Sequence, residues 1–439
     1  YTKTGFLSSQ RKVDAPWQEY AWLPDVVLLQ PDPNVTLIDL TANIPMQVAR
    51  GSVVSDSAGI RQATLLIPQG TQAYIFSSKT TTKTVTSLHF RFTEYTVGEE
   101  GPQAMPGELP PTSGYTYAID LGTDEAIVKV AGRDVVFNQP VIFYLENYLQ
   151  LQDGVPTPMG YYDPDRSMWI AYESGRIIRI VEISNGLAML DVDGDGAVDS
   201  GNLISDAERS TLAQLYAAGQ SLWRGRIDHL SKWDVNQGTR CRENKCEFPK
   251  LSSNPKLEPP DKPTRVCRSI VGCQDQTLGE VIDLVGTPFQ LHYQSDRTAG
   301  RTTDYQLEIP LSGESLPSNI LSILREVSIA GRQDRRRFAA LPNQTEVYRW
   351  DGLDAHGRRV VGAQNMRIRV GYVYELEYVR TERFGYNGDN SISVSAALQE
   401  FILWQTWDIP LVIPENASTQ LGGWSLDVHH FYDPYAKIL

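Results

Sequence analysis

The sequence predicts a mainly β protein, made of several stacked antiparallel β-sandwich domains of the Ig-like kind, with one short helix next to a calcium-like loop. Three observations lead to this prediction. Short runs of β-branched and aromatic residues recur between turn residues from Val26 to about Val428. The run Met366–Val370 alternates between apolar and basic side chains, as a strand with one dry and one wet face does. A single segment shows helical spacing together with clear start and stop signals.

The predicted strands are short and end at Pro, Gly or other turn residues. Besides Met366–Val370, the clearest are Ala63–Pro68, Ala73–Phe76, Val135–Phe137 and Arg176–Ile183. Ser318–Arg325 fits a helix or a strand, because its apolar residues suit both periods. Trp350–Gly357 fits a hairpin in which Gly352 and Gly357 turn the chain and Trp350 packs in a core.

The predicted helix covers Asp206 to Ala218. Ser205 and Glu208 form a capping box, in which each side chain bonds an otherwise unpaired amide of the first turn. Apolar residues follow at helical spacing, and Gly219 offers the left-handed conformation that ends many helices.

About three domains are expected along the 439 residues, since a domain takes roughly 150 residues, and turn-rich segments divide the chain into three such regions and a linker. Residues 1–157 form an N-terminal β region. Residues 158–233 form a small β unit with the Asp-rich loop and the helix. Residues 234–280 are a Pro-rich, Cys-containing linker, and residues 281–439 form the Ig-like β-sandwich region.

Charge and hydropathy exclude several function classes. The chain has 40 Lys and Arg against 53 Asp and Glu, a net charge of −13, which disfavours nucleic acid and anionic membrane surfaces as partners. No apolar run reaches the length of about 20 residues that a spanning helix needs, so membrane insertion is not expected. The chain begins at Tyr1 without a charged and apolar leader, and we interpret this as a mature or trimmed end.

The Asp-rich loop carries the sharpest chemical signal. Carboxylates stand at positions 1, 3 and 5 of a tight loop, followed by a glycine at position 6, as in loops that bind calcium through hard oxygen ligands. The predicted ligands are Asp191, Asp193, Asp195, the Ala197 carbonyl, Asp199 and Asn202. Position 12 is Asn202 rather than a bidentate glutamate, so Asp206 or Glu208 would have to supply the missing carboxylate. The predicted role of Ca²⁺ is structural, fixing the start of the helix; the alternative is a solvated acidic turn without an ion.

The four cysteines lie within one short stretch, and their spacing does not fit a zinc site. They are Cys241, Cys246, Cys267 and Cys273. Local pairing of the first two and of the last two is favoured, while a crossed pairing over the linker stays open. Disulfides would place the chain in an oxidising compartment; the alternative is a reduced, cytosolic state.

No enzyme is expected. The sequence contains neither a zinc-protease nor a nucleophile-elbow motif, and its acidic pairs fall at turns. Asn34, Asn343 and Asn416 stand in N-glycosylation sequons, a weak signal at this frequency. Surface aromatic residues such as Tyr161, Tyr162 and Trp169 could stack on sugars, although most of them are expected in a sandwich core, so glycans are kept as further partners.

Several strings of the sequence resemble the N-terminal region of RHS/YD-repeat proteins, the bacterial relatives of teneurins. They are Glu94–Gly98, Ala104–Tyr117, Met159–Arg166, Tyr216–Trp223, Val285–Arg297, Leu307–Leu311, Trp350–Gly357 and Leu421–His430. The segment Ala63–Gly70 more loosely resembles the start of a ZU5-type β domain, which would cover residues 50–150 or so. The resemblance implies that these segments precede a large YD-repeat shell, and that the aspartates of residues 191–195 match those of the family. No tandem YD repeats occur in the sequence itself.

The functional hypothesis is therefore a non-enzymatic, extracellular or cell-surface scaffold region of an RHS/teneurin-like protein, acting as a calcium-stiffened stalk or plug. Its partners would be other protein chains, namely a downstream YD shell or identical subunits. One alternative is a self-associating subunit of an extracellular filament or matrix, joined through edge strands or Pro-rich segments. The other is a carbohydrate-binding or carbohydrate-active protein.

Overall fold

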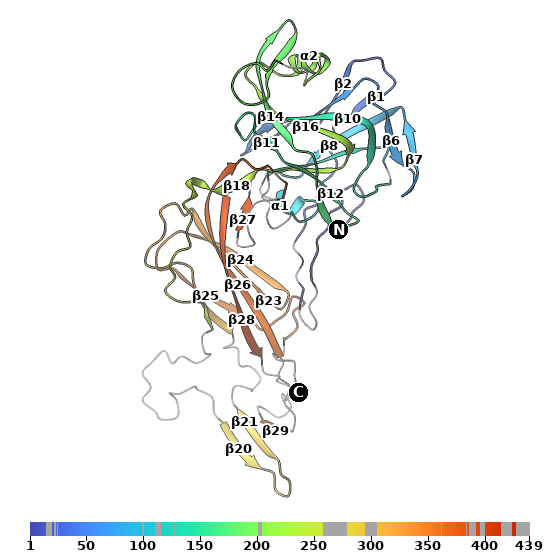
Figure 1. Ribbon diagram of the computed structural model, residues 1–439. Coiled ribbons are helices and arrows are strands. Elements are labelled where there is room, and N and C mark those ends of the chain that lie inside the picture. The colour runs from blue at the N-terminus through green and yellow to red at the C-terminus, as the bar shows by residue number, and fades with distance from the viewer. Residues whose placement is uncertain are drawn as a thin grey trace. The chain divides into compact units, whose positions relative to one another are not determined.

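A computed structural model shows a mainly β chain, as predicted (Figure 1). It describes residues 1–439 except 15–19, 22, 24, 99–100, 110–115, 127, 201–203, 258–278, 295–304, 361, 383, 386–391, 396–399, 414–423 and 427–439. The chain divides into two compact units. Unit 1 contains Tyr1–Lys12, Leu23–Lys245 and Tyr374–Ile402, and unit 2 contains Val13–Trp22, Cys246–Val373 and Leu403–Leu439.

Unit 1 contains two large antiparallel sheets. The six-stranded sheet has the order β1 (Thr36–Asp39), β8 (Ser87–Glu94), β9 (Tyr117–Thr123), β17 (Lys232–Val235), β12 (Met159–Asp163) and β13 (Met168–Ala171). The nine-stranded sheet runs through β11 (Pro156–Thr157), β14 (Gly175–Ser184), β16 (Ser221–Leu230), β10 (Val135–Glu146), β5 (Thr64–Pro68) and β2 (Met46–Arg50). Its remaining strands are β15 (Leu187–Asp191), which pairs with β14, and β6 (Ala73–Phe76), which pairs with β10 and β7 (Thr82–Val85). Smaller elements of the unit before residue 245 are the pair β3 (Val54–Asp56) and β4 (Gly59–Arg61), helix α1 (Gly101–Ala104), a 3₁₀ turn at Arg242–Asn244, and β18 (Gly238–Cys241), which pairs with β26 (Gly362–Val379) and is described with it below.

The two sheets of unit 1 pack face to face. Phe90 and Phe92 of β8 share one buried cluster with Val141, Phe143 and Leu145 of β10. Since side chains alternate along a strand, the residues between them point to the outer faces. Both outer faces are covered in part, which explains why several strands read as continuous apolar runs rather than alternating ones.

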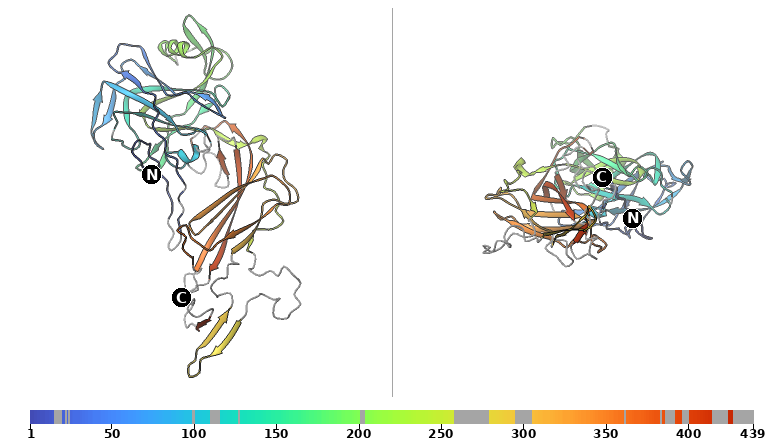
Figure 2. Two further views of the ribbon diagram at one scale, coloured as in Figure 1. Left: turned by 180° about the vertical axis from the view of Figure 1, so that it is seen from behind. Right: turned by 90° about the horizontal axis from the view of Figure 1, so that it is seen from below.

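On the outer face of the nine-stranded sheet lies helix α2 (Asp206–Leu215). Leu66 and Tyr144 point outward from the sheet and join a second cluster with Leu212 of the helix. Both orientations of the ribbon show α2 beside the β14–β15 hairpin (Figures 1 and 2). On the outer face of the six-stranded sheet, Tyr95 and Ala118 form a third cluster that includes Leu7 of the N-terminal segment.

Unit 2 and the strands leading into it are also antiparallel. One sheet has the order β24 (Arg332–Ala339), β23 (Ser322–Ile329), β26 (Gly362–Val379), β28 (Glu400–Ile413) and β27 (Ile392–Ser395), with β18 (Gly238–Cys241) added to β26. Two three-stranded sheets are β19 (Lys256–Leu257), β22 (Tyr305–Pro310) and β25 (Thr345–Trp350), and β20 (Gly279–Asp283), β21 (Gln290–Gln294) and β29 (Trp424–Leu426). Strands β26 and β28 contribute residues to both units.

The five clearest predicted strands are all present, as β5, β6, the start of β10, β14 and part of β26. The ambiguous segment Ser318–Arg325 leads into strand β23 and contains no helix. Trp350 is buried, and its indole N–H donates to the Leu353 carbonyl at 2.9 Å, while Gly352 and Gly357 have positive φ angles of 77° and 74°. The Ig-like topology stays a prediction.

The predicted regions can be compared with the observed structure at two points. The break after Lys245 falls inside the predicted 234–280 linker. The predicted boundary at residue 157, by contrast, does not separate two domains. Strand β10 comes before it and β16 after it, and the two pair within one sheet, from Glu146 opposite Leu222 to Val135 opposite Leu230. None of the helices in the described ranges is long and apolar enough to span a membrane.

Candidate functional site

Three of the predicted calcium ligands converge in the loop that follows β15. One carboxylate oxygen from each of Asp191, Asp193 and Asp195 lies within 4.8 Å of the others. Asp191 is buried, while Asp193 and Asp195 are exposed. Like charges so close together repel one another unless a cation neutralises them. The all-oxygen donor set suits a hard cation such as Ca²⁺.

Backbone amides hold the loop in its tight winding. The Asp191 carboxylate accepts from the Gly194 N–H at 2.7 Å and from the Gly196 N–H at 2.9 Å. Asp195 in turn accepts from the Ala197 N–H at 2.8 Å. Gly194 and Gly196 both have φ of 86°, a conformation that other residues rarely adopt. Each carboxylate oxygen keeps a second lone pair, so these bonds leave coordination capacity for a cation.

Of the other predicted ligands, Asp199 is not part of this group, and the Ala197 carbonyl stays a prediction. Asp199 closes the neck of the loop, because its carboxylate accepts from the Val192 N–H at 2.5 Å and its own N–H donates to the Leu190 carbonyl at 2.9 Å. Asn202 lies outside the described residues. Because Ca²⁺ takes six to eight oxygens, the three carboxylates would need carbonyl or water oxygens as well.

Only one of the two hydrogen bonds of the predicted capping box is present. The Glu208 side chain bonds other groups, so it is not available as a calcium ligand. The Ser205 hydroxyl accepts from the Glu208 N–H at 3.2 Å, as expected. The Glu208 carboxylate instead accepts from Arg224 Nε at 2.8 Å and from the Tyr144 hydroxyl at 2.5 Å. Burial raises the pKa of Tyr144 well above its usual value of 10, which keeps that hydroxyl a donor. Glu208 is thus committed to the sheet, and the proposal that it supplies a loop ligand is wrong.

The back of the loop is pressed against the turn at residues 153–154, a contact that the sequence did not indicate. A Cβ atom on Gly154 would lie 1.9 Å from the Asp193 carbonyl oxygen, and one on Gly194 would lie 2.2 Å from the Asp153 carbonyl oxygen. The Asp153 carboxylate accepts from Arg179 and from Ser221, at 2.5 Å each. The close approach of Gly154 and Gly194 leaves no room for side chains and places the loop directly against the 153–154 turn. Asp153 in turn bonds this turn to β14 and β16.

The prediction that the cysteines form disulfides is confirmed for two of the four. Cys241 and Cys246 are both disulfide-bonded, and no free cysteine occurs within the described ranges. Cys267 and Cys273 lie outside those ranges, so the pairing pattern stays a prediction.

Two of the three sequons can be located. Asn34 is exposed, but its side-chain amide donates to the Arg50 carbonyl at 3.0 Å. Asn343 is exposed in a turn with φ of 52°, and Asn416 lies outside the described residues. Tyr162 and Trp169, considered as sugar-stacking residues, pack on each other in the interior with ring centroids 5.3 Å apart.

Comparison with known proteins gives one consistent result. No family model matches the chain. Over 164 residues, 37% of this chain, it is 30% identical to human teneurin-4 and 29% identical to mouse teneurin-1. More than a third of this chain is similar to teneurins. Teneurin-m of Drosophila melanogaster is 27% identical over 172 residues, and in each case the match covers 5% of the teneurin's own length.

Proposed function

We propose that this chain is a non-enzymatic structural region of a larger extracellular or cell-surface protein of the RHS/teneurin type, a stalk or plug that calcium stiffens. The similarity to teneurins over 37% of the chain supports the type of protein. The oxidised Cys241 and Cys246 support an oxidising compartment. Its partners would be the parts of the longer protein, including a YD-repeat shell.

The convergence of Asp191, Asp193 and Asp195 is the observation that carries the calcium proposal. The loop joins β15 to the segment that leads into α2, and α2 covers the outer face of the nine-stranded sheet. A cation that bridges the three carboxylates would remove their repulsion and tie the helix to the sheet. Because it would bind the folded loop only, it would stabilise the fold by mass action, by about 2.7 kcal/mol at a hundredfold excess over its Kd.

Thermal unfolding in Ca²⁺ and in EDTA tests the proposal. We expect Ca²⁺ to raise the Tm of the native chain, and Asp193→Asn and Asp195→Asn to lose most of that rise. Asp165→Asn is the matched control, since Asp165 is an exposed turn aspartate outside the cluster. Equal Tm values in Ca²⁺ and EDTA would refute calcium stiffening while leaving the scaffold proposal in place.

A specific surface favours self-association as the second candidate function. In the β20–β21 hairpin, Val281 is 55% exposed and Ile282 43% exposed, and Val285 in the turn is fully exposed. Exposed apolar side chains on a sheet are a common means of strand-to-strand association. Sedimentation velocity distinguishes the two functions: a filament subunit forms larger species as concentration rises, and Val281→Lys reduces them, whereas a stalk stays monomeric.

A further inference from the structure

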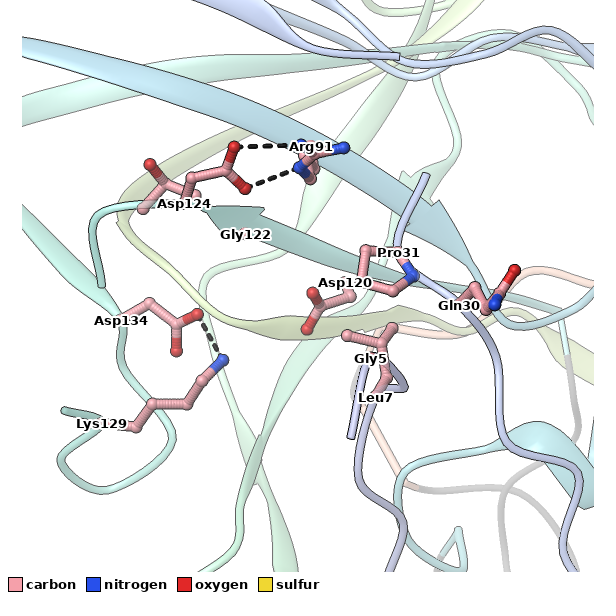
Figure 3. A pocket seen from close by; sticks show the side chains of 11 residues that line it. Gly5, Leu7, Gln30, Pro31, Arg91, Asp120, Gly122, Asp124, Lys129 and Asp134 are labelled. Carbon is pink, nitrogen blue, oxygen red and sulfur yellow. Dashed lines mark hydrogen bonds and ion pairs between the residues drawn. The ribbon is translucent and has the colours of Figure 1, made fainter. Parts of the chain in front are cut away.

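A polar pocket of about 470 Å³ lies in unit 1, on the outer face of the six-stranded sheet (Figure 3). It is separate from the Asp-rich loop and contains none of the residues that the sequence analysis selected as sites. Its lining comes from five stretches of chain: Gly5 and Leu7; Gln30 and Pro31; Arg91; Asp120, Gly122, Thr123 and Asp124; and Lys129 and Asp134.

Two carboxylates in this pocket are buried and incompletely bonded. Asp134 is 2% exposed and Asp120 is 5% exposed. Within the described part of the chain, the Oδ1 atom of each has no hydrogen-bond partner. Buried polar atoms nearly always have partners, because an unpartnered acceptor loses its hydration without compensation. Both aspartates line the pocket, so the missing donors would come from what occupies it.

The basic groups around the pocket each bond an acceptor, but within the described residues none of them bonds Asp120 Oδ1 or Asp134 Oδ1. Lys129 Nζ donates to Asp134 Oδ2 at 2.5 Å. Arg91 donates to Asp124 at 2.6 and 3.0 Å and to the Asp32 carbonyl at 2.8 Å. Lys232, which lies opposite Asp120 in the β9–β17 pair, donates to the Ser8 carbonyl at 2.7 Å. These bonds leave the Oδ1 atoms of Asp120 and Asp134 without a donor.

The charges around the pocket are balanced in number. Three aspartates line it, against one lysine and one arginine, and Lys232 opposite Asp120 is a third basic group. Burial, together with the neighbouring Asp120 and against the attraction of Lys129 and Lys232, nevertheless raises the pKa of Asp134 to about 6. A positively charged group beside Asp120 and Asp134 would favour the ionised carboxylates and fill their free acceptor positions.

We propose that this pocket binds a small organic cation, whose ammonium or guanidinium group donates hydrogen bonds to Asp120 and Asp134. The pocket has the size of small-molecule sites, about 300 to 1,000 Å³, and is far larger than a metal ion requires. Leu7 and Pro31 provide apolar contact for the carbon part of such a ligand. The absence of a Cβ at Gly122 keeps the space beside Asp120 open, since a Cβ there would lie 2.9 Å from Asp120 Oδ2.

A matched pair of probes tests the charge requirement. Isothermal titration calorimetry of the native chain compares n-butylguanidinium with n-butylurea, which has nearly the same shape and no charge. We expect the cation to bind at least about tenfold more tightly, because hydrogen bonds to charged groups are worth roughly twice neutral ones. Affinity for the cation should fall as the pH is lowered through about 6, where Asp134 takes up a proton.

Variants locate the site. Asp120→Asn should weaken n-butylguanidinium binding by about tenfold or more. Asp134→Asn should do the same, but it also leaves Lys129 without its partner, so Asp120→Asn carries the test if that variant fails to fold. Asp165→Asn, at an exposed turn that lines neither the pocket nor the Asp-rich loop, is the control and should bind like the native chain. Equal affinity for both probes, no binding of the cation at about 10 mM, or unchanged binding in a folded Asp120→Asn protein would each overturn the proposal.

Discussion

Glu208 of helix α2 and Arg224 of strand β16 form a buried ion pair, with 2.8 Å between Oε1 and Nε. The Glu208 side chain is 3% exposed and that of Arg224 is 17% exposed, and the Tyr144 hydroxyl completes the network. The pair ties the only long helix of the described residues to the outer face of the nine-stranded sheet. A residue that the sequence assigned to capping thus anchors the whole helix.

Removing one member of this pair should cost much of the unit's stability. Glu208→Ala leaves the Arg224 charge unpaired and buried, and we expect the free energy of unfolding to fall by about 3 kcal/mol. Urea denaturation followed by tryptophan fluorescence measures the change. Glu182→Ala, at an exposed position of β14, should change stability by less than about 0.5 kcal/mol. Equal effects of the two variants would show that the pair contributes no more than a surface residue.

Alanine substitutions at the two glycines of the Asp-rich loop distinguish the cost of backbone strain from the cost of a steric clash. Gly194 and Gly196 have the same φ of 86°, but a Cβ on Gly194 would lie 2.2 Å from the Asp153 carbonyl oxygen, whereas one on Gly196 meets no atom within 4 Å. Gly196→Ala should therefore cost only the backbone strain, about 1 kcal/mol. Gly194→Ala should lower the free energy of unfolding by clearly more, because the 153–154 turn must also move. If both variants melt at the same temperature, the close approach is not a constraint on the loop.

Sequence reasoning succeeded where the signal is local. The 1-3-5 spacing of aspartates brought Asp191, Asp193 and Asp195 together, and Ser205 started the helix. The end of the helix was placed three residues too late, at Ala218 instead of Leu215. Tyr216 has a non-helical φ of −132°, and its hydroxyl donates to the Thr64 hydroxyl of β5 at 3.1 Å. This contact joins residues far apart in the sequence, so the helical spacing of apolar residues cannot predict it.

Features built from distant segments could not be predicted. The apolar run predicts a strand over Ala63–Pro68, observed as β5. It does not indicate that Leu65 and Leu66 belong to two different clusters on opposite faces of the sheet. The pocket combines residues from five stretches of chain between Gly5 and Asp134. None of these stretches contains a sequence motif that indicates a binding site. Asp124, the residue after strand β9, pairs there with Arg91 at 2.6 Å.

A buried arginine links two of the three sheets described with unit 2, namely the sheet of β23 and β24 and the sheet of β25. Arg325 of β23 is 2% exposed and pairs with Glu346 of β25 at 2.7 Å and with Asp334 of β24 at 2.8 Å. Arg325→Met keeps much of the volume but leaves the largely buried Glu346 with only the exposed Arg336, at 3.5 Å, as a partner, so we expect a loss of about 3 kcal/mol. Arg332→Met is the matched control, because the ion pair of Arg332 with Asp351 is about half exposed on both sides and should contribute less than about 1 kcal/mol. Differential scanning calorimetry should show a large fall in Tm for the first variant alone; similar small shifts in both would contradict the bridging role.

Asp134 should make stability depend on pH in an unusual direction for an aspartate. Its pKa is raised from 3.8 to about 6 in the folded chain, mainly by burial. The folded state therefore binds the proton more tightly than the unfolded state does, and this contribution to stability is fully present below pH 3.8 and lost as the pH rises through about 6. Asp134→Asn removes the titrating group, so the stability of the native chain relative to this variant should fall between pH 4 and pH 7 or so. Urea denaturation of both proteins across that range measures the difference, and Asp165→Asn should show no such trend. A difference that stays constant, or grows with pH, would mean that Lys129 alone keeps the carboxylate ionised.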